Sequence, residues 1–116
     1  MSDETHYKAT SRSTAVLGRT ITSARGNHFI IDSPSGPAEA LSTGEAFMAG
    51  IAACGVTLIQ ARARDGGITL GGLDVTADGV RVASAPADLN RVDMRFEFRG
   101  TSQADAKHLV GLWQQQ

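Results

Sequence analysis

Residues 42–59, STGEAFMAGIAACGVTLI, form the segment that decides the fold. It is the longest apolar stretch of the chain, and it holds the only cysteine, Cys54. Apolar residues recur in it at steps of four, three and four, the spacing of one helical face: Phe47, Ile51, Cys54 and Leu58. Most other positions are glycine or alanine. We therefore expect a central helix that is buried on most of its circumference.

The start of this helix carries a specific signal. Ser42 and Glu45 stand three residues apart, as in a capping box, where each side chain accepts a hydrogen bond from the other residue's backbone N–H. Gly50 and Gly55 lie inside the helix and each cost up to about 1 kcal/mol relative to alanine. We expect another backbone or helix to approach closely at these glycines.

Shorter segments before the helix have the composition of strands. Residues 7–17 and 19–23 predict a hairpin, residues 25–27 a turn, and residues 28–32 a third strand. Residues 33–37, SPSGP, cannot continue a sheet and predict a loop that leads to the helix.

The segments after the helix predict two more strands and a second helix. Residues 73–77 alternate apolar and polar side chains, and Asp78-Gly79 indicates a turn. A looser connection is expected over residues 83–90. Residues 91–99 give the clearest strand, with apolar side chains on one face and charges on the other. Ser102 then opens a helix that we expect to continue to the last residues, so the order predicts an α+β fold.

Composition limits the possible functions. The 116 residues make one domain, and 41% hydrophobic and 20% charged residues are ordinary globular values. A net charge of −1 gives no electrostatic case for binding nucleic acid or an anionic membrane. No run reaches the roughly 18 uncharged apolar residues of a spanning helix, and the N-terminus lacks signal-peptide features. The single cysteine fits a reducing cytoplasm, and three scattered histidines predict neither a metal nor another cofactor.

Residues 25–34, RGNHFIIDSP, and residues 45–54, EAFMAGIAAC, together resemble the OsmC/Ohr family of osmotically inducible and organic hydroperoxide resistance proteins. That family has a strand ending in Asp-x-Pro, then a Gly/Pro loop and a helix containing Ala-Ala-Cys. Residues 71–75 and 91–100 are similar to its later strands, so the resemblance runs from about residue 7 to the end. It implies a single OsmC-like domain over residues 1–116 and an intertwined homodimer whose central helices pack together.

The resemblance also implies an activity. Members of the family are thiol peroxidases that reduce organic hydroperoxides in oxidative-stress defence. By match of motif, Cys54 would be the peroxidatic cysteine and Glu45 the glutamate of the active-site network. The activating arginine would be Arg19 in the Ohr-like pattern or Arg25 in the OsmC-like one, and both alternatives stay open.

Three departures from the family pattern affect this expectation. Thr43-Gly44 replaces the proline before the helix, and the loop after Pro34 is short and lacks the usual Gly-Gly pair. The family's second, resolving cysteine is not in the sequence. Either the protein is a one-cysteine relative reduced by an external thiol, or its reading frame is truncated before the C-terminal tail. One hypothesis is a UGA codon after Gln116 that encodes selenocysteine, which the downstream DNA tests.

Taken without the family, the same residues have structural explanations. A cysteine on an apolar helical face is more often a core residue, and Cys54 lies beyond the first turn, where the helix dipole lowers a pKa. Capping alone explains Glu45, which stands about 13 Å along the axis from Cys54 and faces the opposite side. Arg19 and Arg25 are surface arginines by default. The alternative to an enzyme is therefore a non-catalytic dimeric binding module.

Overall fold

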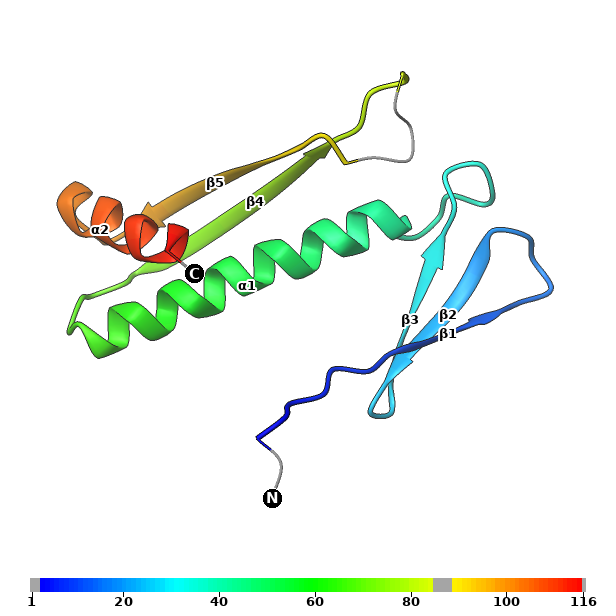
Figure 1. Ribbon diagram of the computed structural model, residues 1–116, viewed down its shortest axis with the longest axis horizontal. Coiled ribbons are helices and arrows are strands. Elements are labelled where there is room, and N and C mark those ends of the chain that lie inside the picture. Colours follow the sequence, from blue (N-terminus) through cyan, green and yellow to red (C-terminus); the bar gives the residue numbers. More distant parts are fainter. Residues whose placement is uncertain (1–2, 85–88, 116) are drawn as a thin grey trace. The chain divides into compact units, whose positions relative to one another are not determined.

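The computed structural model describes residues 3–84 and 89–115. Its elements are, in order, β1 (Thr10–Ser13), β2 (Arg19–Ala24), β3 (Asn27–Asp32), α1 (Thr43–Asp65), β4 (Gly72–Val80), β5 (Arg91–Arg99) and α2 (Gln103–Gln114), all labelled in Figure 1. This order confirms the predicted α+β class. The chain forms two compact units, Met1–Ala46 and Phe47–Gln116, and each is described by itself.

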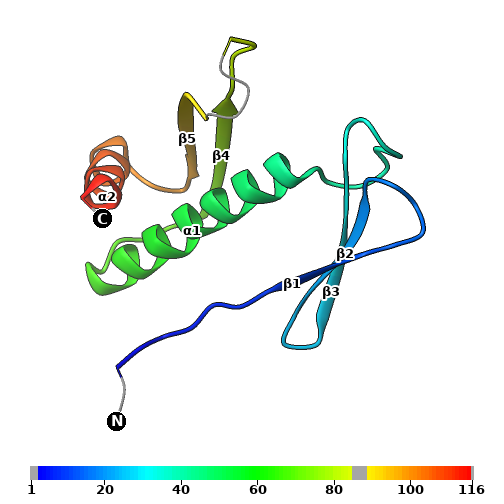
Figure 2. The ribbon, with the colours of Figure 1, turned by 45° about the vertical axis from the view of Figure 1, so that its right-hand side comes forward.

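The N-terminal unit is an antiparallel three-stranded sheet in the order β1-β2-β3 (Figure 2). A two-residue turn joins β2 to β3, and both of its residues, Arg25 and Gly26, have positive φ, of 50° and 80°. Such turns match the natural twist of a hairpin, and this one is a residue shorter than the predicted turn at 25–27, because Asn27 already belongs to β3. It pairs Ala24 with Asn27 and, five steps back, Arg19 with Asp32.

The first strand is shorter than the predicted residues 7–17, because the side chain of Thr14 turns the chain. Its hydroxyl accepts a hydrogen bond from the N–H of Val16 at 3.1 Å and donates one to the carbonyl oxygen of Arg19 at 3.0 Å. These local bonds replace a strand ladder, as threonine side chains often do at turns. β1 therefore ends at Ser13.

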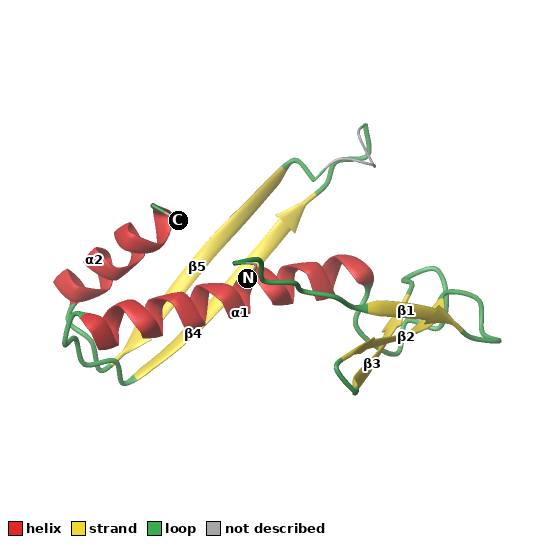
Figure 3. Ribbon diagram, turned by 60° about the horizontal axis from the view of Figure 1, so that its bottom comes forward, coloured by secondary structure: helices red, strands yellow, loops and turns green. Residues whose placement is uncertain are grey.

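The C-terminal unit contains an antiparallel ribbon of β4 and β5, drawn as two long strands in Figure 3. β5 has the predicted bounds, but the turn predicted at Asp78-Gly79 is wrong, since β4 continues to Val80 and Gly79 pairs with Val92. A Cβ built on Gly79 would lie 2.8 Å from Sδ of Met48 on α1. This glycine therefore serves a close helix approach and not a turn. The predicted loose connection at 83–90 lies partly outside the described residues.

The core of this unit lies between the ribbon and the two helices. Ile59 and Ala63 of α1 and Leu109 of α2 are its buried apolar residues. Phe96 of β5 meets Trp113 of α2 edge to face, with ring centroids 5.2 Å apart. The apolar face of the ribbon is thereby partly covered, and its charged face stays exposed, as the alternating pattern predicts.

Both ends of α1 follow their sequence signals. At its start, the Ser42 hydroxyl accepts from the N–H of Glu45. At its other end, Gly67 adopts a left-handed φ of 66°, and the N–H of Ile68 donates to the carbonyl oxygen of Ala63 at 2.9 Å. This is the usual glycine C-cap. α2 begins with Ser102 accepting from the N–H of Asp105, and it ends at Gln114, slightly before the predicted continuation to the last residue.

One large face of α1 is bare, so the expectation of burial on most of its circumference is wrong within this chain. Only Gly55, Ile59 and Ala63 of α1 are buried, whereas Phe47 is 62% exposed. The predicted stripe through Phe47 and Cys54 is not the packed face. Within the C-terminal unit, the ribbon and α2 pack on the side of α1 that carries Gly55, Ile59 and Ala63.

The same helix is long and apolar enough to cross a membrane when judged by length and composition alone. Only 17% of its most apolar 18-residue window is buried within the chain. A core helix passes this test as well, so one such helix is weak evidence for a span. What the finding establishes is a large apolar surface on α1 that this chain does not cover.

Candidate functional site

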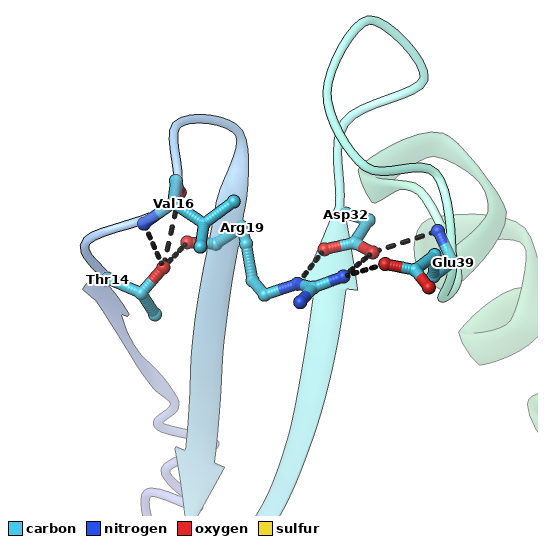
Figure 4. Close-up of polar contacts among 5 residues, drawn as sticks. All are labelled: Thr14, Val16, Arg19, Asp32 and Glu39. Carbon is cyan, nitrogen blue, oxygen red and sulfur yellow. Dashed lines mark hydrogen bonds and ion pairs between the residues drawn. The ribbon is translucent and has the colours of Figure 1, made fainter.

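The best-defined polar cluster is centred on Asp32, at the end of β3 (Figure 4). Its carboxylate accepts two hydrogen bonds from Arg19 of β2: Nε donates to Oδ1 at 2.8 Å and Nη2 to Oδ2 at 2.9 Å. Asp32 is fully buried, and the side chain of Arg19 is 26% exposed. A bidentate pair of this kind fixes the plane of the guanidinium as well as its position.

The loop between β3 and α1 closes over the same carboxylate. The backbone N–H of Glu39 donates to Oδ2 of Asp32 at 2.9 Å, and the Glu39 carboxylate accepts from Nη2 of Arg19 at 2.9 Å. The N–H of Asp32 donates in turn to the carbonyl oxygen of Leu41 at 2.9 Å. Asp32 therefore ties together β2, β3 and the last loop residues before α1.

Close backbone packing holds this loop against the β1–β2 turn. Gly18 has a left-handed φ of 86°, and its carbonyl oxygen accepts from the N–H of Ser33 at 2.6 Å. A Cβ built on Gly36 would lie 3.0 Å from the carbonyl oxygen of Leu17. The two glycines let the loops meet directly beside Arg19.

The charges of the cluster stabilise one another. The guanidinium of Arg19 lowers the pKa of Asp32 to about 2, with the N–H groups of Glu39 and Ala40 acting in the same direction against the cost of burial. The two carboxylates raise the pKa of Arg19 in return. The ion pair is consequently present over the whole physiological pH range.

Glu45 performs the capping role that the sequence predicts. Its Oε1 accepts from the N–H of Ser42 at 2.9 Å, and the Ser42 hydroxyl accepts from the N–H of Glu45 at 3.2 Å. The capping box at the start of α1 is thus confirmed. Within the described residues, no hydrogen bond or ion pair joins Glu45 to Arg19 or Arg25.

Arg25 lies at the exposed tip of the β2–β3 hairpin. Its backbone is left-handed, and its carbonyl oxygen accepts a long hydrogen bond of 3.5 Å from the side chain of Asn27. Its guanidinium forms no ion pair with any residue that the structure describes. Of the two candidate arginines, Arg19 is held in place and Arg25 is not.

Cys54 is a free and exposed thiol near the middle of α1. The neighbouring Gly55 is buried, and a Cβ there would meet Val75 at 3.2 Å, so Cys54 lies outside the face that packs on the ribbon. In addition to the backbone hydrogen bonds of the helix, the Thr57 hydroxyl donates to the Cys54 carbonyl oxygen at 3.2 Å. The thiol is therefore open to reagents that reach this apolar face.

The C-terminal unit also has a shallow groove of about 350 Å³ between β5 and α2. Its lining combines two phenylalanine rings with polar side chains. The main lining residues are Phe96, Phe98, Thr101, Lys107, Val110 and Gln114. Among residues 3–84 and 89–115, no group of three or more histidine, cysteine or acidic side chains is placed to hold a metal ion.

The structure thus joins one predicted residue, Arg19, to two that the sequence analysis missed, Asp32 and Glu39. Asp32 had a detectable signal: counting back from a two-residue turn at Arg25-Gly26 places Arg19 directly opposite Asp32. Glu39 had none, because it reaches Arg19 through an irregular loop. Cys54 belongs to the other compact unit.

Solved structures share this fold. A Psychrobacter arcticus 273-4 protein, described as an osmotic stress induced and detoxification response protein, has a TM-score of 0.77 at 21% identity, covering 96% of this chain and 84% of its own. An OsmC like protein from Mycoplasma pneumoniae has a TM-score of 0.83 at 18% identity, with coverages of 94% and 80%. For an organic hydroperoxide resistance protein OsmC from Legionella pneumophila, the values are 0.68, 22%, 93% and 82%.

Sequence comparisons identify no relative of this chain. No protein-family model matches the chain, and a search of curated proteins gives no match either. The structural neighbours, all below 25% identity, define the class: the chain has an OsmC-like α+β fold. The neighbours are OsmC-like and organic hydroperoxide resistance proteins, and this confirms the fold that the sequence resemblance implied.

Proposed function

We propose that the protein is a thiol-dependent peroxidase that reduces organic hydroperoxides through Cys54. The observation that carries the proposal is an exposed, unpaired thiol on the bare apolar face of α1 in an OsmC-like fold. In the reaction, the thiolate attacks the O–O bond of ROOH. The S–O bond forms as the O–O bond breaks, and with one proton the products are Cys54–SOH and the alcohol ROH.

Turnover requires a reductant. Two external thiols convert the sulfenic acid back to the thiol, releasing water and one disulfide. A thiol-rich compartment such as the cytoplasm supplies this reductant, which fits a role in oxidative-stress defence. The apolar residues around Cys54 suit the alkyl body of the hydroperoxide.

Arg19 is the arginine that we propose for activation of Cys54. A thiolate far from a helix N-terminus needs a cation, and a guanidinium fixed by a buried carboxylate is a preorganised one. Arg25, at the tip of an exposed turn, lacks such a partner. We assign Glu45 to the same network through its second carboxylate oxygen, since Oε1 serves the cap.

A homodimer completes this proposal. The bare face of α1 needs a cover, and a second copy of the same helix offers a self-complementary one. A bilayer fits this face less well, because Glu45 and Arg62 bound an uncharged run shorter than the roughly 20 residues of a span.

The test is to expose the protein to cumene hydroperoxide and trap the sulfenic acid for mass spectrometry. Wild-type protein should form one adduct at Cys54 and consume hydroperoxide when a dithiol is supplied. Cys54→Ser should do neither, and residual consumption by that variant would refute Cys54 as the nucleophile. Arg19→Ala should slow the reaction at least about tenfold, with Arg25→Ala as the matched control for the other arginine.

The groove beside α2 favours a second candidate, a dimeric binding module without turnover. Its volume of about 350 Å³ and its two phenylalanine rings suit a small ligand with an apolar part. A Cys54 thiol that does not react with hydroperoxide at neutral pH would select this candidate. Ligand-induced change in Trp113 fluorescence then measures binding, since Trp113 meets the groove residue Phe96.

A further inference from the structure

We propose that Asp32 is a positioning residue for the peroxidase reaction: it holds Arg19 by Nε and Nη2 and leaves Nη1 free to donate. This inference rests on the proposed function. It adds a residue that makes no contact with the reacting atoms but decides how the cation is presented.

The three nitrogens of the Arg19 guanidinium differ in their hydrogen-bond partners. Nε and Nη2 form one edge and are both bound to the Asp32 carboxylate, at 2.8 and 2.9 Å. Nη1 forms no hydrogen bond with any residue that the structure describes. Because the guanidinium is planar, fixing the first edge also fixes the direction of the two N–H groups on Nη1. Nη1 is therefore the nitrogen available to a thiolate or a peroxide oxygen.

Asp32 is itself held from several sides, so it cannot follow the arginine if the latter moves. It is fully buried, and its carboxylate accepts from the backbone N–H of Glu39 as well as from Arg19. These three donors occupy most of the roughly four lone-pair positions of the carboxylate. Its own N–H is tied to Leu41.

Glu39, the other carboxylate on Arg19, differs in kind. Its side chain is 75% exposed and contacts only Nη2, which Asp32 already holds. An exposed ion pair of this type contributes little and exchanges readily with water. The orientation of Arg19 therefore depends on Asp32 and not on Glu39.

The variant Asp32→Asn tests the position of Arg19 without removing the charge of Arg19. Asparagine keeps the shape of aspartate but has only one acceptor oxygen. Its amide N–H would face donors, and Arg19 would lose half of its anchor while keeping its own charge. We expect the reaction of Cys54 with hydroperoxide to slow at least about tenfold. Asp74→Asn is the matched control, since Asp74 also pairs bidentately with an arginine, Arg99, on the exposed ribbon. It should react at the wild-type rate.

A double variant shows whether Asp32 acts through Arg19. Arg19→Ala with Asp32→Asn should react no more slowly than Arg19→Ala alone. Multiplicative losses would overturn the inference, and so would a folded Asp32→Asn variant with the wild-type rate. Wild-type Cys54 that never reacts would instead overturn the proposed function.

One measurement needs no variant of Asp32 and so survives a failure of Asp32→Asn to fold. In wild-type protein, the Nε–H resonance of Arg19 should be resolved and protected from solvent exchange at neutral pH, unlike that of the exposed Arg25. Equally rapid exchange of both resonances would show that Arg19 is not held by its Nε edge, and the inference would fail.

Discussion

Gly55 of α1 rests directly on Val75 of β4: a Cβ built on the glycine would lie 3.2 Å from Cγ1 of the valine. The same Cβ would be 3.6 Å from the ring of Phe96. The helix backbone thus packs against the ribbon with no room for a side chain, which is the close approach that a mid-helix glycine indicates.

Gly55→Ala should destabilise the protein by about 1–3 kcal/mol, because overpacking outweighs the gain of up to about 1 kcal/mol in helix propensity. Urea unfolding followed by circular dichroism measures the change. Gly111→Ala is the control, since it changes a glycine of α2 with no atom within 4 Å of the added Cβ. It should stabilise slightly, and equal effects of the two substitutions would contradict the packing argument.

Acid should unfold the protein in part through Asp32. Its pKa is about 2 when folded against an ordinary value of 3.8, so the unfolded chain binds more protons between these values. The stability that Asp32 contributes is therefore complete above about pH 4 and is lost as the pH falls towards about 2. Unfolding measured across this range should be steeper in pH for wild type than for Asp32→Asn. Parallel curves would exclude this linkage.

Two substitutions of Glu45 distinguish its capping role from its proposed role in the reaction. Glu45→Gln retains an acceptor oxygen for the N–H of Ser42, so the free energy of unfolding should hardly change. Glu45→Ala removes the acceptor and should cost up to about 1 kcal/mol. If the carboxylate serves the peroxidase network, both variants should slow the reaction of Cys54. Wild-type kinetics in Glu45→Gln would confine Glu45 to its cap.

The bare face of α1 makes the dimer testable with one charge. Phe47→Glu changes a side chain that is 62% exposed in the single chain, so it should leave the secondary structure intact. Sedimentation at micromolar concentration should show a dimer for wild type and a monomer of 12.1 kDa for the variant. A wild-type monomer would remove the proposed cover of α1, and a dimeric variant would move the interface elsewhere.

Local chemistry made several elements predictable from the sequence. The capping serines, the two-residue hairpin turn and the alternation of β5 each act over a few residues, and the structure has them where the sequence placed them. The prediction of a turn at Asp78-Gly79 was wrong because glycine serves either in turns or where another element approaches the backbone closely. Only the contact with Met48, distant in sequence, shows that this glycine admits a helix.

The sequence also could not predict which face of α1 packs against the ribbon. Nearly every position of the helix is apolar or small, so periodicity could not distinguish the packed side from the side through Phe47 and Cys54. For the site, the pattern indicated Arg19 but not its partner. In the sequence, Asp32 is recognisable only as the end of a strand. Its burial depends on the loop that follows, and no sequence pattern specifies the path of that loop.

The arginine network lies entirely between Arg19 and Leu41, within one hairpin and its following loop. Contacts of such short sequence separation form early, because little chain entropy is lost in closing them. We therefore expect Arg19 and Asp32 to pair before α1 packs against the ribbon of β4 and β5. The network lies within the N-terminal unit, so substitutions in the C-terminal unit should leave the pairing of Arg19 with Asp32 intact.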